Sequence, residues 1–420
     1  MATFVKWIKP VTALLALVLI IGVGISTVYR AGPYRFGATT WGSPAHRTDF
    51  TVYQQAGRAV LDGTNIYDAH NIRDWYYMYL PVFAVAMVPF ALLSVFWASL
   101  LWYVLSVLMI GHAVWVSVRL ARKLIPDTMI SGFWLGTLTT LLVLRATMSG
   151  ITRGQASLLV TYLVVLSVWL YVRQREWFAG FCLAGSIVLK IFPALLVLYF
   201  LAKRRYRMVV ATGVWLVVMV LIVPGCVFGV HGDNALLRQW LTTIALPANT
   251  PERAAGNVRY GQMINPRLDR NQSVQAVLIR WFSGSTTETA VPAREPLARR
   301  VAAAVNLYLL LVTVWACRRG KGEGDRRETL FQLCAIMLLM LFLSPVSWNH
   351  NYTLLVLPLA VGVATGATDG ATARVFRATL AFFLILILVS LIVKPLYVFG
   401  ALLWSALAIW AAFVGELKTA

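Results

Sequence analysis

Long apolar stretches alternate with polar connectors along the whole chain. They lie near 11–29, 79–95, 97–118, 131–148, 156–172, 178–201, 208–229, 301–316, 330–346, 352–366, 375–393 and 397–414. Most are about 18 residues or longer, which as a helix crosses a ~30 Å hydrocarbon core. Because backbone groups in lipid must hydrogen-bond within their own segment, these stretches predict helices. The pattern predicts an all-α, polytopic transmembrane helix bundle.

Two long polar interruptions, 30–76 and 230–299, break this alternation. We find no internal repeat and no soluble insertion, so we expect a single membrane-embedded domain over 1–420. The first apolar segment, 11–28, lacks a convincing signal-peptide cleavage site and is interpreted as a retained helix with a cytoplasmic N-terminus. This orientation makes both interruptions extracytoplasmic loops.

The composition agrees with a membrane protein and explains the charge. The chain is 60% hydrophobic and 13% charged, with a net charge of +21. Basic clusters at 172–176, 202–207 and 317–327 fall between apolar segments, as in the cytoplasmic loops of membrane proteins, so we expect no nucleic-acid partner. Four full spans within 79–172 would put the first cluster outside. One segment must therefore be short or re-entrant, and we favour the outer side for 153–155.

The first polar interruption contains a predicted amphipathic helix. Thr48 or Asp49 suits its N-cap, and Gly63 suits its end. An apolar face recurs with helical spacing at Val52, Ala56, Ala59 and Val60, while Gln54, Gln55, Arg58 and Asp62 face elsewhere. We expect this helix to lie along the membrane surface.

The same loop is the densest supply of carboxylates, because no Asp or Glu lies inside an apolar segment. Asp62 and Asp68 flank turn residues, and Asp74 stands at the re-entry into the membrane. Asp49 has a defined helix register, with Tyr53 one turn along the same face. Asp49 is therefore the candidate for acid–base chemistry, with a simple helix cap as the alternative.

Polar groups within apolar surroundings give further candidates, since they are costly in a membrane. Arg153 and Gln155 interrupt a helical pattern and could bind an anionic or sugar group, or could form a plain interfacial turn. Lys190, followed by a proline, is too far from the interface to reach it easily and could bind a phosphate or satisfy backbone carbonyls.

A third polar group lies in the turn "LSPVSWNHNYTLL" (343–355), where Asn349 and His350 are candidates to line a cavity; an interfacial position is the alternative. The second long loop returns to the membrane through "NQSVQAVLIRW" (271–281), predicted to be an amphipathic helix that contains Gln272. The four cysteines are far apart, and we expect no metal site.

Four stretches together resemble glycosyltransferase family 87. They are "DFTVYQQAGRAVLDGTNIYD" with "YMYLPVFA", "RGQASLL" with "GSIVLKIFPALL", "NQSVQAVLIRW" and "LSPVSWNHNYTLL". The resemblance covers about residues 40–366. The chain departs from the family pattern at 79–81, where "YLP" replaces Tyr-Pro-Pro, at Ser157, where Asn is usual, and at Asn351, where a second His is usual.

The resemblance implies a GT-C fold of about 11–13 membrane helices and an integral membrane enzyme of the cell envelope. It implies transfer of a sugar, with mannose as the family expectation and a pentose as an alternative. The donor would be a polyprenyl-phosphate sugar and the acceptor a glycolipid or glycan, with membrane lipids around both. The active site would be extracytoplasmic at the plasma membrane, and the only cofactor-like molecule would be the lipid-linked donor.

The resemblance assigns the catalytic Asp to Asp49, as an inverting base. Lys190, Arg153 and His350 are then expected to bind the donor phosphate. The expected sugar- or acceptor-binding residues are Tyr53, Gln155, Asn349 and Gln272. A transporter or flippase of lipid-linked sugars is the rival interpretation, but it would not need a loop carboxylate at a fixed helix start.

Overall fold

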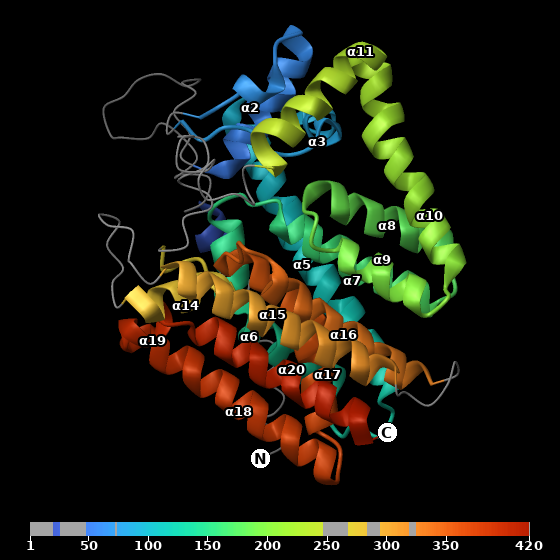
Figure 1. Ribbon diagram of the computed structural model, residues 1–420, viewed down its shortest axis with the longest axis vertical. Coiled ribbons are helices and arrows are strands. Elements are labelled where there is room, and N and C mark those ends of the chain that lie inside the picture. The colour runs from blue at the N-terminus through green and yellow to red at the C-terminus, as the bar shows by residue number, and fades with distance from the viewer. Residues whose placement is uncertain are drawn as a thin grey trace.

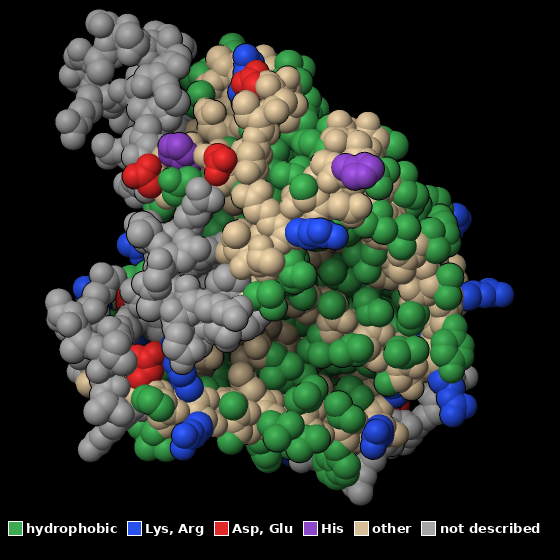
Figure 2. Space-filling model, turned by 45° about the horizontal axis from the view of Figure 1, so that its top comes forward, with side chains coloured by type: hydrophobic (Ala, Val, Ile, Leu, Met, Phe, Trp, Pro, Cys, Tyr) green, Lys and Arg blue, Asp and Glu red, His purple; other side chains and the backbone are tan. Residues whose placement is uncertain are grey.

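The computed structural model describes residues 20–25, 48–71, 74–246, 268–283, 295–318 and 325–419. Among these residues the extended pairings are two isolated bridges, and the regular structure is otherwise helical (Figure 1). Five described helices are long and apolar enough to cross a membrane: 95–124, 132–151, 206–245, 295–318 and 371–392. Hydrophobic side chains cover most of the described face in Figure 2. The prediction of an all-α polytopic membrane protein is confirmed.

The described helices follow one another as a series of antiparallel rods. The first are α2 (Asp49–Asp62), η1 (Ile66–Asp68), α3 (Pro81–Ala86), α4 (Val88–Ala91), α5 (Val95–Leu124), α6 (Gly132–Ile151), α7 (Ser157–Val172), α8 (Glu176–Leu189), α9 (Ala194–Ala202) and α10 (Tyr206–Val217). Then come η2 (Val218–Ile222), α11 (Val223–Trp240), η3 (Leu241–Ala245), α14 (Val274–Ser283), α15 (Glu295–Arg318), α16 (Arg326–Leu343), η5 (Asn349–Leu355), α17 (Val356–Gly366), α18 (Ala371–Ile392), α19 (Lys394–Val398) and α20 (Ala401–Thr419).

Helix α2 begins and ends where the sequence predicts, but it is packed inside the protein. Its N-cap is Thr48, so Asp49 is the first helical residue rather than the cap, and Gly63 ends the helix in the left-handed conformation. Gln54, expected on the polar face, is buried, and its Nε2 donates to the carbonyls of Phe90 and Leu93 at 3.1 and 3.0 Å. Because these carbonyls close α4, a polar side chain of α2 joins the two helices.

The apolar segment 79–95 does not form one spanning helix. It folds as the short helices α3 and α4, each with a proline in its first turn, where proline is favoured. Helix α2 crosses the junction so closely that a Cβ on Gly57 would lie 2.6 Å from the carbonyl oxygen of Met87. This is the short segment that the count of spans requires.

The chain then alternates between two ends of the bundle. At the end called here the Asp49 end, the backbone N–H of Asp49 donates to the carbonyl of Arg153, 3.0 Å away. At the opposite end, the Lys203 end, Lys203 Nζ donates to the carbonyl of Cys317 at 2.6 Å. Since α5, α7 and α9 all run toward this second end, the basic residues that follow or close them gather there.

The helix that leaves the Lys203 end runs further than predicted. The stretch Tyr206–Ala245 is helical over 40 residues, with a kink at Gly229 (φ 72°, ψ 157°), so the predicted loop at 230–299 begins later. Within that loop, the helix predicted over 271–281 is α14. Residues 247–267 and 284–294 lie outside the described residues, as does most of the predicted first segment, 11–28.

Candidate active site

The start of α2 is clamped by the turn that follows α6. The carbonyl of Arg153 accepts the Asp49 N–H, and the carbonyl of Gly154 accepts a hydrogen bond from Trp102 Nε1 at 3.1 Å. Gly154 has φ +62°, and a Cβ there would lie 2.6 Å from the Cβ of Phe50. Only glycine allows this turn to approach the first residues of α2 so closely. The turn therefore fixes the position of Asp49.

A side-chain contact orients the Asp49 carboxylate. Gln155 Nε2 donates to Asp49 Oδ2, so the predicted sugar ligand Gln155 is engaged by the predicted base. A hydrogen bond to a carboxylate favours its charged form. Both residues are partly exposed, which leaves the carboxylate within reach of a substrate.

Two tyrosines stand beside this carboxylate. The hydroxyls of Tyr53 and Tyr79 are 3.0 Å apart, and their rings meet edge to face. Burial, the neighbouring Tyr79 and the Asp49 charge together raise the pKa of Tyr53 well above its usual value. Tyr53 therefore stays protonated and can act only as a hydrogen-bonding group. Tyr79 was not singled out from the sequence, although it stands in the divergent "YLP" motif.

Lys190 lies where a helix breaks. Helix α8 ends at Leu189, Lys190 is extended, and α9 starts after Pro193. Lys190 Nζ donates to Ser157 Oγ at 2.8 Å and to Asn351 Oδ1 at 2.6 Å. Its described partners are thus side chains, not the backbone carbonyls of the alternative interpretation. The Asp49 carboxylate and the Lys190 ammonium also attract each other electrostatically.

The two partners of Lys190 are the positions at which the chain departs from the family pattern. Ser157 Oγ donates to Asn351 Oδ1 at 3.0 Å, and both residues are buried. The sequence showed each substitution separately but gave no sign that they touch. In the structure the two changes form one contact around one cation.

The turn between α16 and α17 presents neighbouring residues to different partners. His350 is buried close enough to Lys190 and Arg153 for both charges to act on it. Burial, together with these cations, lowers the pKa of His350 well below its usual value of 6.5. His350 is therefore neutral at neutral pH, and it could help to bind a phosphate by donating a hydrogen bond rather than by its charge.

Asn349 belongs to a second group beside the first. Its Nδ2 donates to the hydroxyl of Tyr397, and the guanidinium of Arg145 lies over the Tyr397 ring, 4.1 Å from its centroid. Asn349 Oδ1 is buried, without a hydrogen-bond partner among the described residues. Arg145 and Tyr397 were not singled out from the sequence, because neither belongs to a recognisable motif.

Gln272 reaches the same second group through the backbone. It is fully buried, and its Nε2 donates to the carbonyls of Asp269 and Tyr397 at 2.6 and 3.0 Å. Its Oε1 has no hydrogen-bond partner within the part of the chain that the structure describes. Gln272 thus meets Asn349 at Tyr397, and no described contact joins it to Asp49.

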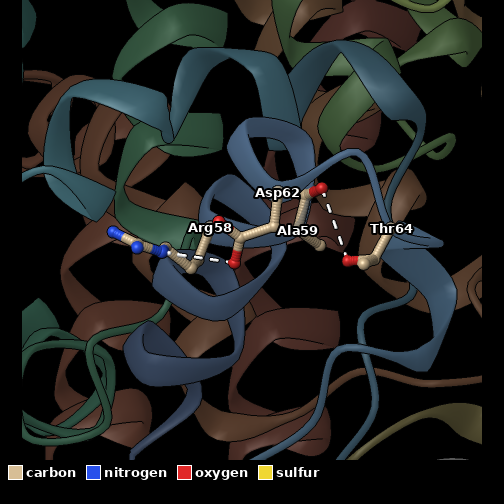
Figure 3. Close-up of polar contacts among 4 residues, drawn as sticks. All are labelled: Arg58, Ala59, Asp62 and Thr64. Carbon is tan, nitrogen blue, oxygen red and sulfur yellow. Dashed lines mark hydrogen bonds and ion pairs between the residues drawn. The ribbon is translucent and has the colours of Figure 1, made fainter.

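The other loop carboxylates lie away from this network. Asp62 pairs with Arg58 at 3.3 Å on the exposed side of α2, beside the contact between Thr64 and the carbonyl of Ala59 (Figure 3). Asp74 lies 4.0 Å from His70, and both side chains are exposed. Among these carboxylates, Asp49 is the one in described contact with buried polar groups. The residues described include no cluster of three or more His, Cys, Asp or Glu side chains that could hold a metal.

Similarity to known proteins points to sugar transfer. A polyprenol-phosphate-mannose-dependent alpha-(1-2)-phosphatidylinositol mannoside mannosyltransferase of Mycolicibacterium smegmatis is 28% identical over 355 residues, which cover 80% of this chain and 73% of the relative. A protein of the same description from Mycobacterium tuberculosis is 27% identical over 344 residues, 75% of this chain and 70% of the relative.

A third relative, a polyprenol-phosphate-mannose-dependent alpha-(1-2)-phosphatidylinositol pentamannoside mannosyltransferase of Mycobacterium tuberculosis, is 25% identical over 362 residues, 84% of this chain and 72% of the relative. No solved structure matches the chain. The sequence profile of glycosyltransferase family 87 matches residues 77–345, from just before α3 to the turn after α16, and so includes the Arg153 turn and Lys190. Because this match extends over well more than half of a chain that forms an all-α membrane bundle, the protein belongs to glycosyltransferase family 87.

Proposed function

We propose that the protein transfers a mannosyl residue from polyprenyl-phosphate mannose to a glycolipid or glycan acceptor, with a mannosylated phosphatidylinositol as the leading acceptor. The donor and acceptor named in the descriptions of its relatives support this choice. The lipid-linked donor supplies both the sugar and the leaving group, so the proposal requires no further cofactor.

One observation carries the proposal: the Asp49 carboxylate and the Lys190 ammonium attract each other where α2 meets the break between α8 and α9. A base for the acceptor hydroxyl and a cation for the donor phosphate are the two groups that this transfer needs. They approach each other at the Asp49 end of the bundle, where Gln155 holds one and Ser157 with Asn351 holds the other.

The reaction is a single displacement. The acceptor hydroxyl oxygen attacks the anomeric carbon and forms the new C–O bond, while Asp49 takes the hydroxyl proton. The bond between the anomeric carbon and the phosphate oxygen breaks, and the polyprenyl phosphate leaves with the electron pair. Because attack and departure occur on opposite faces, the anomeric configuration inverts. A phosphate leaving group needs no general acid, unlike the sugar alkoxide of glycosidases.

The surrounding residues have separate roles in this scheme. Lys190, with Arg153 and the neutral His350, binds the donor phosphate and stabilises the charge that develops on it. Tyr53 orients the sugar by its hydroxyl. Asn349 and Gln272 each present a buried carbonyl oxygen that can accept a hydrogen bond from a sugar hydroxyl.

The orientation in the membrane follows from charge. Basic residues gather at the Lys203 end, and such clusters in short loops mark the cytoplasmic side. The Asp49 end would then face the extracytoplasmic side of the plasma membrane, with the predicted loops at 30–76 and 230–299 beside it. In this orientation the short segment α3–α4 stays at the outer side and the count of spans agrees with the three basic clusters.

The test is mannosyl transfer by the purified protein in detergent. Radiolabelled polyprenyl-phosphate mannose and a phosphatidylinositol mannoside are the substrates, and labelled product lipid is measured for the wild type, Asp49→Asn and Asp62→Asn. We expect the wild type and Asp62→Asn to be active and Asp49→Asn to lose at least about 100-fold, the lower range for a general base.

Asp62→Asn is a matched control, because it removes a carboxylate from the same helix without touching the buried network. Detergent abolishes the two compartments that transport requires, so product there identifies a transferase rather than a flippase. Equal activity in Asp49→Asn and the wild type would remove Asp49 from the chemistry. If both are inactive with mannose and active with a pentose donor, the choice of sugar is wrong.

A further inference from the structure

A cavity of about 590 Å³ lies at the Lys203 end, far from the proposed active site. Its lining residues are Trp115, Val118, Arg119, Arg122, Lys123 and Gly132. Five of them belong to the last turns of α5, and the sixth is the first residue of α6. Helix α5 has 30 residues, about 45 Å at 1.5 Å per residue, so this cavity and the Asp49 end lie at opposite ends of the bundle.

The cavity wall is strongly cationic. Arg119, Arg122 and Lys123 contribute three positive charges, and no lining residue is acidic. Within the described residues, none of the three side chains has a carboxylate within 4.0 Å. Such a group of uncompensated cations around a concave surface favours an anionic ligand.

Two further features shape the cavity for an anion at a membrane interface. The guanidinium of Arg119 lies over the Trp115 ring, 5.0 Å from its centroid, which holds both at the cavity wall. The cavity also reaches the N-terminus of α6, whose backbone N–H groups attract negative charge. Gly132 leaves this approach open, since a Cβ there would lie only 3.2 Å from Arg122 Nη1.

An apolar track leads from the cavity along α5. Leu101, Leu108 and Trp115 recur every seven residues on one face of the helix and are 42%, 62% and 45% exposed. Because α5 is longer than a ~30 Å hydrocarbon core, its basic last turns reach the headgroup level while this face meets the acyl chains. The track and the cavity together match a molecule with an apolar chain and an anionic head.

We infer that the cavity binds the phosphate headgroup of an anionic phospholipid from the leaflet at the Lys203 end, with an acyl chain along the exposed face of α5. Basic pockets between membrane helices are suited to such headgroups. This site is separate from the donor and acceptor sites, and the inference does not depend on the proposed mannosyl transfer.

Binding is tested on the purified full-length protein by native mass spectrometry, with phosphatidylglycerol and phosphatidylcholine of identical acyl chains. We expect the wild type to bind phosphatidylglycerol about tenfold or more tightly than phosphatidylcholine, in keeping with the contribution of each cation near an anionic lipid. The double variant Arg119→Gln with Arg122→Gln should lose this preference.

A second variant separates the cavity from its charge. Gly132→Leu fills the opening and leaves the net charge unchanged, so it should also lose the preference and keeps the test decisive if the double variant does not fold. The matched control is Arg207→Gln, an exposed arginine in the first turn of α10 at the same end of the bundle. It should keep the preference within about twofold, since it does not line the cavity.

Three results would overturn the inference. The first is equal binding of the two lipids by the wild type. The second is an equal loss in Arg207→Gln, which would indicate a diffuse positive surface. The third is displacement of phosphatidylglycerol by millimolar inorganic phosphate, which would assign the cavity to a free anion.

Discussion

The hydroxyl of Ser157 donates to the side-chain carbonyl of Asn351 at 3.0 Å, and both atoms accept a hydrogen bond from the same lysine. The two residues are 194 positions apart and are the two departures from the family pattern that surround Lys190. A serine and an asparagine have thus replaced a larger pair around one cation. The position of the Lys190 ammonium depends on both.

This contact predicts energetic coupling between the two positions. Ser157→Asn and Asn351→His each alter one side of the contact, and the double variant restores the pair typical of the family. We expect each single variant to lose about tenfold in kcat/KM for the lipid donor, the effect of one hydrogen bond to a charged group. The double variant should lose less than the product of the two, with a coupling of about 1 kcal/mol.

A double-mutant cycle on initial rates measures this coupling. Lys190→Met serves as the reference, because neither substitution should matter once the cation is gone. Strictly additive losses in the presence of Lys190 would show that the contact does not position the lysine.

Gly154→Ala should disturb both the stability and the start of α2. Its φ of +62° strains any other residue, and its Cβ would lie 2.6 Å from that of Phe50. Gly63→Ala is a matched control, since Gly63 has φ +66° but no atom within 4 Å of such a Cβ. We expect about 1 kcal/mol of destabilisation for Gly63→Ala from backbone strain alone, and at least about 1 kcal/mol more for Gly154→Ala.

Thermal unfolding in detergent compares the two variants, and sugar transfer at a permissive temperature tests the position of Asp49. Gly154→Ala should reduce transfer, whereas Gly63→Ala should not. Equal unfolding midpoints would mean that the turn can move away from Phe50 without cost.

Gln155→Glu should shift the pH dependence of transfer. The base must be ionised, so the rate falls as the pH falls through the acid limb of the profile. A second carboxylate beside Asp49 disfavours the ionised base, which moves that limb to higher pH. Gln155→Ala removes the amide without adding charge and should lower the rate about tenfold while moving the limb much less.

The measurement is a pH profile of kcat/KM for each protein. An unchanged acid limb in Gln155→Glu would show that the group that titrates on this limb is not Asp49.

His350 predicts that the protein loses stability in acid. Its folded pKa is lowered below the usual 6.5 by burial and by the charges of Lys190 and Arg153. Below about pH 6.5 the unfolded chain therefore binds a proton that the folded chain excludes, and folded stability falls by up to about 1.4 kcal/mol per pH unit. Above that pH the neutral imidazole is present in both states and the effect disappears.

Thermal midpoints at pH 7.5 and pH 5.5 measure this loss in the wild type and in His350→Gln. The variant lacks the titrating group and should lose less stability on acidification. Equal losses in the two proteins would place the acid-sensitive group elsewhere.

Local signals predicted local structure well. Asp49 and Gly63 bracket α2, and Lys190 with Pro193 marks the break between α8 and α9, because capping, left-handed glycine and proline act within a few residues. The segment 79–95 was harder to interpret. Its hydropathy suits a span, whereas its two prolines start two short helices that α2 packs against.

The assembly of the candidate site depends on contacts that no local pattern contains. Gln54 carries a polar side chain and was assigned to the polar face, yet it is buried because the carbonyls at the end of α4 accept its amide. Tyr397 and Arg145 meet Asn349 although they belong to three separate elements. A single sequence shows which residues are polar, but their partners are set by how distant helices pack.

The hydrogen bond between Lys190 and Asn351 also has a consequence for biosynthesis. The asparagine is 161 residues downstream of the lysine, so at roughly 5–20 residues per second it leaves the ribosome roughly 8 to 32 s later. During that interval the cation has Ser157, made 33 residues earlier, but not its second acceptor. A nascent chain that stops before α17 would hold a half-satisfied lysine at a helix break, the kind of defect by which membrane quality control could recognise an incomplete copy.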